Sequence, residues 1–149
     1  MMTIDKFIAR SIARIWAGLL IALLCNSAFA LEPGIEAFGN DVDGVRHVSA
    51  TEAAEILKKY PSVKILDVRT GIEYNRGHIS DATNINYYSF SFKEKLAKLD
   101  KNITWLVHCR SGVRSGKSLP ILKSLGFSSI IHLDGGTSAW TKSGLPLQK

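Results

Sequence analysis

The sequence predicts an α/β domain built on an open, mainly parallel five-stranded sheet with helices on both faces. Short runs rich in β-branched and aromatic residues alternate with stretches of helical periodicity. The central runs are apolar nearly throughout, which is typical of strands that are covered on both faces. The chain has 149 residues, 46% of them hydrophobic, and this size suits one domain with a sizeable core.

Five short runs are expected to form the strands. In chain order they cover residues 46–48, 63–68, 83–85, 104–108 and 129–133. The helices between them imply right-handed crossovers between parallel strands, so the carboxyl ends of the strands meet at one edge of the sheet. Ligands of open α/β sheets bind beyond that edge.

Four helices are expected between and after these strands. Ser49 and Glu52 have the spacing of a capping box and begin the first helix, which Pro61 stops. The other helices are expected over residues 90–99, from Arg114 to Gly126, and around Ala139 and Trp140.

Residues 1–30 have the three parts of a secretory signal peptide. Three basic side chains precede an apolar run over residues 15–24, and Ala28 and Ala30 place small residues where a signal peptidase reads them. We expect cleavage after Ala30 and an exported protein, periplasmic if the source is a bacterium. An uncleaved membrane anchor is the alternative, but the run is shorter than the roughly 20 residues that a bilayer core requires. No stable membrane insertion is expected after cleavage.

Residues 31–45 are rich in glycine and aspartate and are expected to form an N-terminal arm, so the domain proper covers residues 46–149. Without its signal the chain carries sixteen basic and twelve acidic side chains, a net charge of +4. The lysines are scattered and no nucleic-acid-binding module is recognisable. Nucleic acid is therefore not expected as a partner.

Cys109 is the one cysteine left after signal cleavage. It cannot form an internal disulfide, so it is either a buried small hydrophobe or a reactive thiol. Residues 108–115 read as a strand end, a glycine-containing loop and a helix start, which is the arrangement of an anion cradle. Backbone N–H groups, the helix dipole, Arg110 and Arg114 are expected to lower the pKa of the Cys109 thiol. These neighbours favour a reactive nucleophile.

Residues 109–115, Cys-Arg-Ser-Gly-Val-Arg-Ser, resemble the active-site loop of rhodanese-type sulfurtransferases. Two other stretches agree in order and spacing. They are Asp67-Val68-Arg69 through Gly77-His78-Ile79 to Asn84-Ile85, and Leu133-Asp134-Gly135-Gly136 with Ala139-Trp140 and Gly144-Leu145-Pro146. The resemblance covers residues 46–147, nearly the whole expected domain.

By this resemblance Cys109 attacks the outer sulfur of an anionic donor such as thiosulfate, releases sulfite and keeps the sulfur as a persulfide. It then passes the sulfur to a thiophilic acceptor such as cyanide or a thiol. The residues implied in binding are Arg110, Ser111, Gly112, Val113 and Arg114, and those implied in support are Asp67, Arg69 and Ser115. Asp67 is expected to order its loop through an ion pair with Arg69. The reaction requires no metal and no cofactor beyond the covalent persulfide, and the resemblance names no protein partner.

A cysteine phosphatase or arsenate reductase is the nearest enzymatic alternative, because it also uses a cysteine in an anion-binding loop. Four residues separate Cys109 from Arg114, whereas those enzymes have a loop longer by one residue, a wider ring that suits a tetrahedral anion. No aspartate is identifiable as the acid that would protonate a leaving oxygen. The non-enzymatic alternative is a persulfide carrier or redox sensor, which an exposed docking surface beside Cys109 would distinguish.

The four histidines are not assigned to the chemistry. His78 and His132 are expected to be hydrogen-bonded scaffold residues. His108 is expected to point to the opposite side of its strand from Cys109. No partner is predicted for His47.

Overall fold

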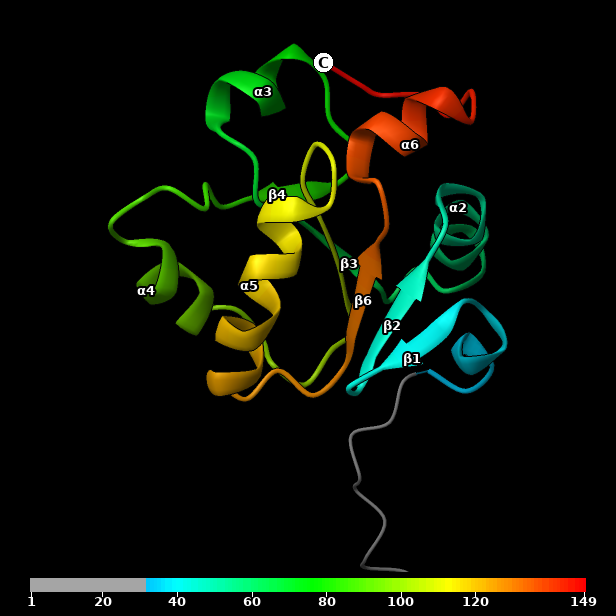
Figure 1. Ribbon diagram of the computed structural model, residues 1–149, viewed down its shortest axis with the longest axis horizontal. Helices are drawn as coiled ribbons and strands as arrows, with labels where there is room; N and C mark the ends of the chain where they lie inside the picture. The colour runs from blue at the N-terminus through cyan, green and yellow to red at the C-terminus, as the bar shows by residue number, and fades with distance from the viewer. Residues whose placement is uncertain (1–31) are drawn as a thin grey trace, which may run out of the picture.

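A six-stranded sheet runs through the middle of the molecule (Figure 1). The structure is a computed structural model that describes residues 32–149. Its strands are β1 (Asn40–Val42), β2 (Val45–Val48), β3 (Lys64–Asp67), β4 (Ala82–Asn84), β5 (Trp105–His108) and β6 (Ile130–Leu133). The order across the sheet is β1-β2-β6-β5-β3-β4; β1 and β2 are antiparallel, and the other neighbours are parallel. The predicted open, mainly parallel α/β class is confirmed.

The predicted count of five strands is wrong by one, because β1 lies in the segment that was expected to form an arm. Asp43 and Gly44 have positive φ angles of 52° and 72° and form the two-residue turn of a hairpin in which Val42 pairs with Val45. Asp-Gly is a strong hairpin signal, but the exposed residues before it lack the apolar alternation of a strand. Ile35 is fully buried, so this segment packs onto the domain.

The four predicted helices are present in the predicted order, and the structure adds two short ones, the 3-10 helix η1 (Ile35–Ala37) and α3 (Gly71–Arg76). The predicted ones are α2 (Ala50–Lys59), α4 (Phe92–Ala97), α5 (Val113–Ser124) and α6 (Gly136–Lys142). The capping box predicted for Ser49 and Glu52 is present at the start of α2. The unpredicted α3 also begins with a capping box, formed by Thr70 and Glu73, but none of its six residues is buried. It therefore has no apolar periodicity from which a helix could be recognised.

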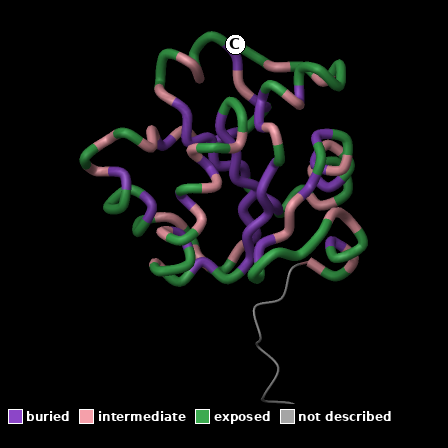
Figure 2. Tube along the Cα trace, in the orientation of Figure 1, coloured by how far each residue is buried: buried purple, intermediate pink, exposed green. Residues whose placement is uncertain are grey.

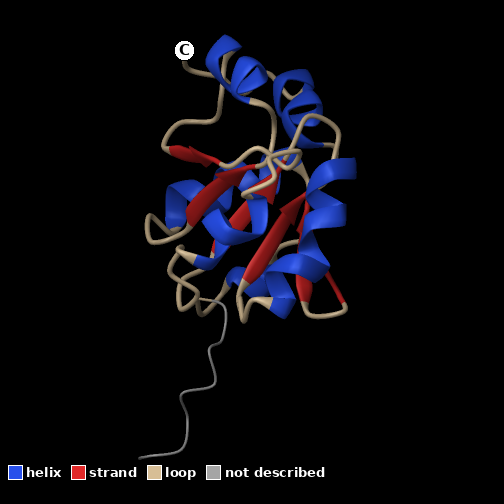
Figure 3. Cartoon of the chain, turned by 90° about the vertical axis from the view of Figure 1, so that its left-hand side faces the viewer, coloured by secondary structure: helices blue, strands red, loops and turns tan. Residues whose placement is uncertain are grey.

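Helices cover both faces of the sheet (Figures 1 and 3). Ile56 of α2 belongs to the core on one face, which α6 also covers, and Leu122 of α5 belongs to the core on the other face, which α4 also covers. Successive strand residues point to opposite faces, and accordingly Ile130 of β6 lies in the second core while Ile131 lies in the first. Figure 2 shows the buried residues concentrated along the strands.

The carboxyl edge of the parallel strands gathers the segments that carry the sequence motifs. β5 ends at His108, directly before Cys109, and α3 and the start of α6 lie at the same end of the sheet (Figure 1). Within residues 32–149, no helix has the length and apolar character needed to cross a membrane. The predicted signal peptide, residues 1–30, lies outside the described residues.

Candidate active site

The loop after β5 wraps around the sulfur atom of Cys109. Gly112 is the N-cap of α5 and has a φ of 91°, a left-handed conformation that glycine adopts without steric cost. This turn aims the Gly112 N–H at the Cys109 sulfur, with 3.2 Å between nitrogen and Sγ. The hydroxyl of Ser115, in the first turn of α5, lies 3.6 Å from the same sulfur. The local sequence thus places hydrogen-bond donors on the thiol.

The surroundings of Cys109 favour its thiolate. Burial opposes ionisation, but the N–H and hydroxyl groups of Ser115, with the N–H groups of Ser111 and Arg114, outweigh it and lower the pKa of the Cys109 thiol. The sulfur-facing donors therefore include Ser111, Gly112 and Arg114, as the sequence implied, and Ser115 in addition. Val113 is not among these donors, and the residue is 62% exposed.

The backbone at the start of α6 is hydrogen-bonded to the loop around Cys109. The N–H of Thr137 donates to the carbonyl of Cys109, and the N–H of Ser138 donates to the carbonyl of Arg110, each at 2.9 Å. Gly136 has a φ of 56°, and a Cβ there would lie 2.8 Å from the carbonyl carbon of Arg110 and collide with the carbonyl oxygen of Cys109. The glycine pair of the sequence motif thus permits close contact between two backbone segments.

Arg114 is held by a partner that the sequence analysis did not identify. Its guanidinium donates to both carboxylate oxygens of Glu73 at 2.7 Å, which lowers the pKa of Glu73 to about 2 and raises that of Arg114. The ring of Tyr88 lies 5.7 Å from the guanidinium carbon. Arg110, in contrast, is exposed and forms no ion pair with any residue among 32–149.

Asp67 and Arg69 form the local ion pair that the sequence predicted. The Arg69 guanidinium donates to both Asp67 oxygens at 2.6–3.0 Å, and its Nη2 also donates to the carbonyl of Gly77 at 2.9 Å. Both side chains are buried, so the pair fixes the loop between β3 and α3. His108 is fully buried, with its Nε2 3.8 Å from Asp67; burial lowers its pKa and keeps it neutral.

A series of hydrogen-bonded side chains connects Ser115, next to the Cys109 sulfur, with His132, Asp134 and His47. Ser115 Oγ lies 2.8 Å from His132 Nε2, and the Nδ1 atoms of His132 and His47 each lie 2.8 Å from Asp134 Oδ1. Burial lowers the pKa of His132, although Asp134 opposes this shift. His132 is hydrogen-bonded, as predicted, but to a residue of the cysteine loop, and His47 has a partner after all.

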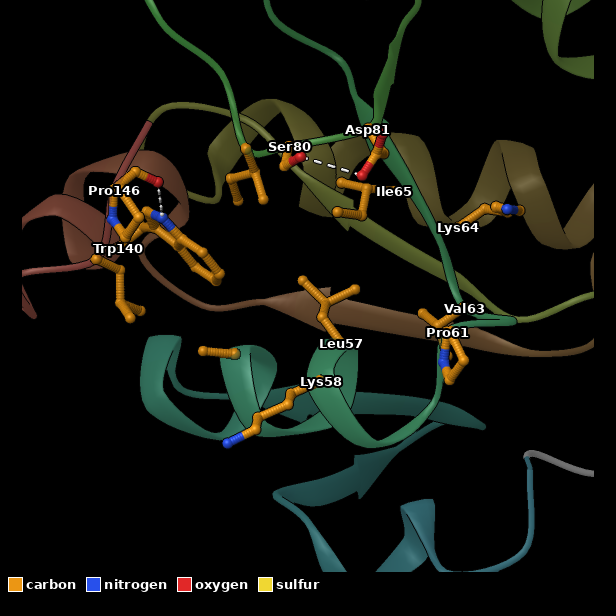
Figure 4. A pocket seen from close by; sticks show the side chains of 13 residues that line it. Leu57, Lys58, Pro61, Val63, Lys64, Ile65, Ser80, Asp81, Trp140 and Pro146 are labelled. Atoms are coloured by element: carbon orange, nitrogen blue, oxygen red, sulfur yellow. Dashed lines mark hydrogen bonds between the residues drawn. The ribbon is translucent and has the colours of Figure 1, made fainter. Parts of the chain in front are cut away.

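Two hollows in the surface have different characters. One of about 390 Å³ lies beside the cysteine loop and is lined by the basic residues Arg69, Arg76 and Arg110 together with Glu73 and α6. The other, about 510 Å³, is apolar and lies between α2 and α6 (Figure 4). Leu57 and Trp140 line it, and no residue of the cysteine loop does. Of these two hollows, the basic one is therefore next to the Cys109 loop.

The fold and the loop together define a class of protein. A cysteine with a lowered pKa sits at the carboxyl edge of a parallel sheet, inside a ring of N–H groups that can hold a negative charge. Such a site supports nucleophilic attack by sulfur and storage of the transferred group on the cysteine. The class is that of α/β proteins with a cysteine thiol of lowered pKa in an anion-binding loop.

Comparison with known proteins identifies the family. Residues 49–143 match the Rhodanese-like domain family, and the chain belongs to it. The chain is 34% identical over 99 residues to a probable adenylyltransferase/sulfurtransferase, MoeZ, of Mycobacterium tuberculosis, a match that covers 66% of this chain and 25% of that protein. It is 33% identical over 95 residues to the thiosulfate sulfurtransferase GlpE of Shewanella oneidensis, covering 64% and 91%. This chain therefore spans about a quarter of the length of the mycobacterial relative.

A solved structure agrees with this assignment. The crystal structure of a rhodanese-related protein from Thermoplasma volcanium superposes with a TM-score of 0.61 at 28% sequence identity. The match covers 68% of this chain and 96% of that one. The expected family and fold are both confirmed.

Proposed function

We propose that this protein is a sulfurtransferase that carries sulfane sulfur as a persulfide on Cys109. The observation that carries the proposal is the set of donors around the Cys109 sulfur, namely the Gly112 N–H at 3.2 Å and the groups of Ser111, Arg114 and Ser115 that lower its pKa. The names of the relatives, which include a thiosulfate sulfurtransferase, support the same chemistry. The donor is proposed to be thiosulfate or a similar small anion.

The reaction balances without a metal, a cofactor or an external oxidant. The Cys109 thiolate attacks the outer sulfur of thiosulfate, the S–S bond of the donor breaks, and its electron pair leaves on sulfite. The persulfide anion then lies among the loop N–H groups. Cyanide or a thiolate attacks the outer sulfur of the persulfide, and the Cys109 thiolate is released for the next cycle.

The two arginines are proposed to have different roles. Arg110 is exposed and lines the basic hollow of about 390 Å³, so it suits the capture of the dianionic donor. Arg114 is fixed by Glu73 at 2.7 Å and contributes positive potential from a set position. Asp67 and Arg69 hold the adjacent loop. We also propose, on the sequence of residues 1–30, that the protein is exported, to the periplasm if the source is a bacterium.

The decisive experiment is intact mass spectrometry of the reduced protein before thiosulfate, after thiosulfate, and after subsequent cyanide. We expect a gain of about one sulfur atom that cyanide removes. Cys109→Ser should show no gain. A folded, reduced protein that gains no mass would exclude thiosulfate as the donor and leave other sulfur sources to be tested in the same way.

One observation favours a second candidate function, delivery of sulfur to a protein thiol. Ile72, Tyr88 and Val113 are 70%, 67% and 62% exposed, and they lie on the segments that the Glu73–Arg114 pair and the Tyr88 contact bring together. Exposed apolar side chains around a reactive group are typical of protein-docking surfaces. A carrier of this kind would form the persulfide but would turn over slowly with cyanide, and steady-state kinetics distinguish the two.

A further inference from the structure

The register of two neighbouring strands brings three metal-ligand side chains together. His47 of β2 and His132 of β6 are direct partners in the parallel pairing. Asp134 follows His132 by two residues, so its side chain points to the same face of the sheet. These three residues therefore project from one point at the carboxyl edge, although 85 positions in the sequence separate His47 from His132.

The ligand atoms of this cluster lie close enough to contact a common ion. The two Nδ1 atoms are 3.4 Å apart, and each is 2.8 Å from the same carboxylate oxygen, Asp134 Oδ1. Zinc is bound by imidazole nitrogen and carboxylate oxygen at about 2.0–2.2 Å. One ion seated against this triangle can reach all three atoms with small side-chain adjustments.

The type and surroundings of the ligands favour a transition metal. Two imidazoles and one carboxylate suit zinc and similar borderline ions, whereas calcium and magnesium prefer oxygen alone. His132 is 6% exposed at its side chain, while His47 and Asp134 are 26% and 55% exposed, so one ligand is anchored and two are accessible. His47 also lines a hollow of about 320 Å³ between β2 and α5, which gives solvent access to the cluster.

His132, the buried residue of the cluster, already has the hydrogen-bond partner that a metal-binding histidine normally requires on its second ring nitrogen. Such a histidine coordinates through one ring nitrogen and hydrogen-bonds through the other. His132 presents Nδ1 to the cluster and has Nε2 2.8 Å from the buried Ser115 hydroxyl. The ring is thus oriented before any ion arrives.

We propose that His47, His132 and Asp134 form a binding site for one divalent transition-metal ion of the zinc class, with an open position for water. The site lies outside the ring of donors around Cys109, and the sulfur-transfer steps do not require it. Ser115 contacts both His132 and the Cys109 sulfur, so the two sites are neighbours.

The test is calorimetric titration of zinc into tag-free Cys109→Ser protein, in which the thiol cannot bind the ion. We expect one zinc ion per chain, and visible d–d absorption when cobalt replaces zinc. His47→Gln and Asp134→Asn should each weaken binding by more than about tenfold. His78→Gln, which changes a histidine outside the cluster, should bind zinc like its Cys109→Ser parent.

The folded state of each variant is checked by circular dichroism and by its unfolding temperature without zinc. Saturating zinc should raise the unfolding temperature of the parent and of His78→Gln but not of His47→Gln. Absence of binding to the folded parent, or equal binding by His47→Gln and Asp134→Asn, would overturn the proposal and leave a hydrogen-bond network only. Because the Cys109→Ser parent cannot form a persulfide at position 109, this result does not depend on the proposed function.

Discussion

Glu73 and Arg114 join α3 to the first turn of α5 through two hydrogen bonds of 2.7 Å. Arg114 belongs to the loop around Cys109, and Glu73 also accepts from the backbone N–H of Thr70 at the start of α3. The pair therefore holds α3, beside the site, against α5, the helix that follows the Cys109 loop. The same carboxylate caps one helix and positions the arginine of the other.

Replacing Glu73 by glutamine should destabilise the protein at pH 7 by about 1 kcal/mol, since a bidentate, partly shielded pair lies at the upper end for accessible ion pairs. The pKa of Glu73 falls from 4.5 to about 2 on folding. A lowered carboxyl pKa contributes stability that is complete above pH 4.5 and is lost as the pH falls toward 2. The difference in the free energy of unfolding between wild type and Glu73→Gln, measured by urea denaturation, should therefore shrink as the pH is lowered from 5 to 3.

Glu94→Gln is the matched control for this prediction. Glu94 pairs with Lys98 at 3.0 Å, but both side chains are at least 70% exposed, so its loss should have little effect at any pH. Equal effects of the two substitutions would show that Glu73 contributes only as an ordinary surface charge.

The contrast between predicted and unpredicted parts of the site follows from distance along the chain. The donors around Cys109 lie within six residues of it, so a strand end, Gly112 and a helix start were sufficient to predict them. Glu73 is 41 residues from Arg114, and nothing local to either side chain indicates the pair. Tertiary packing alone brings them together.

The same argument applies to the His47, His132 and Asp134 cluster. Both strands were predicted, but pairing β2 directly with β6 requires knowledge of the strand order, which the sequence did not give. Once that order is known, His47 and His132 become register partners. β1, the strand that was not predicted, had in contrast a local signal: Asp43-Gly44 is a turn that a search for hairpins would have found.

Ser115→Ala should raise the pKa of the Cys109 thiol, because it removes the hydroxyl that helps to stabilise the thiolate while leaving the backbone donors. At pH 7 the rate of alkylation by iodoacetamide should fall by about two- to tenfold, the value of one hydrogen bond. The pH profile of alkylation should shift to higher pH. Ser118→Ala, a buried serine of the same helix that bonds to the Ser115 carbonyl, should leave the profile in place. If the profiles of Ser115→Ala and wild type coincide, the backbone donors alone lower the pKa of the Cys109 thiol.

Gly136→Ala should destabilise the protein by about 3 kcal/mol or more, since it adds backbone strain and a collision with the loop carbonyls. Gly144 also has a positive φ, 75°, but an added Cβ there meets no atom within 4 Å. Gly144→Ala should therefore cost only about 1 kcal/mol of conformational strain. Urea denaturation of both variants separates strain from collision, and equal losses would rule out the close contact between Gly136 and the Cys109 loop.

Arg110→Ala should impair capture of the donor without affecting the fold. Arg110 is exposed and unpaired among the described residues, so the free energy of unfolding should stay within about 0.5 kcal/mol of wild type. Loss of a charge-assisted contact to a dianion should lower kcat/KM for thiosulfate by about tenfold or more, mainly through KM. The salt dependence of kcat/KM should weaken as well, because less charge steers the donor. Lys117→Ala removes an exposed charge from α5, the helix that follows the Arg110 loop, and controls for net charge. If it lowers kcat/KM as much as Arg110→Ala does, Arg110 acts through the general field of the protein and not through contact with the donor.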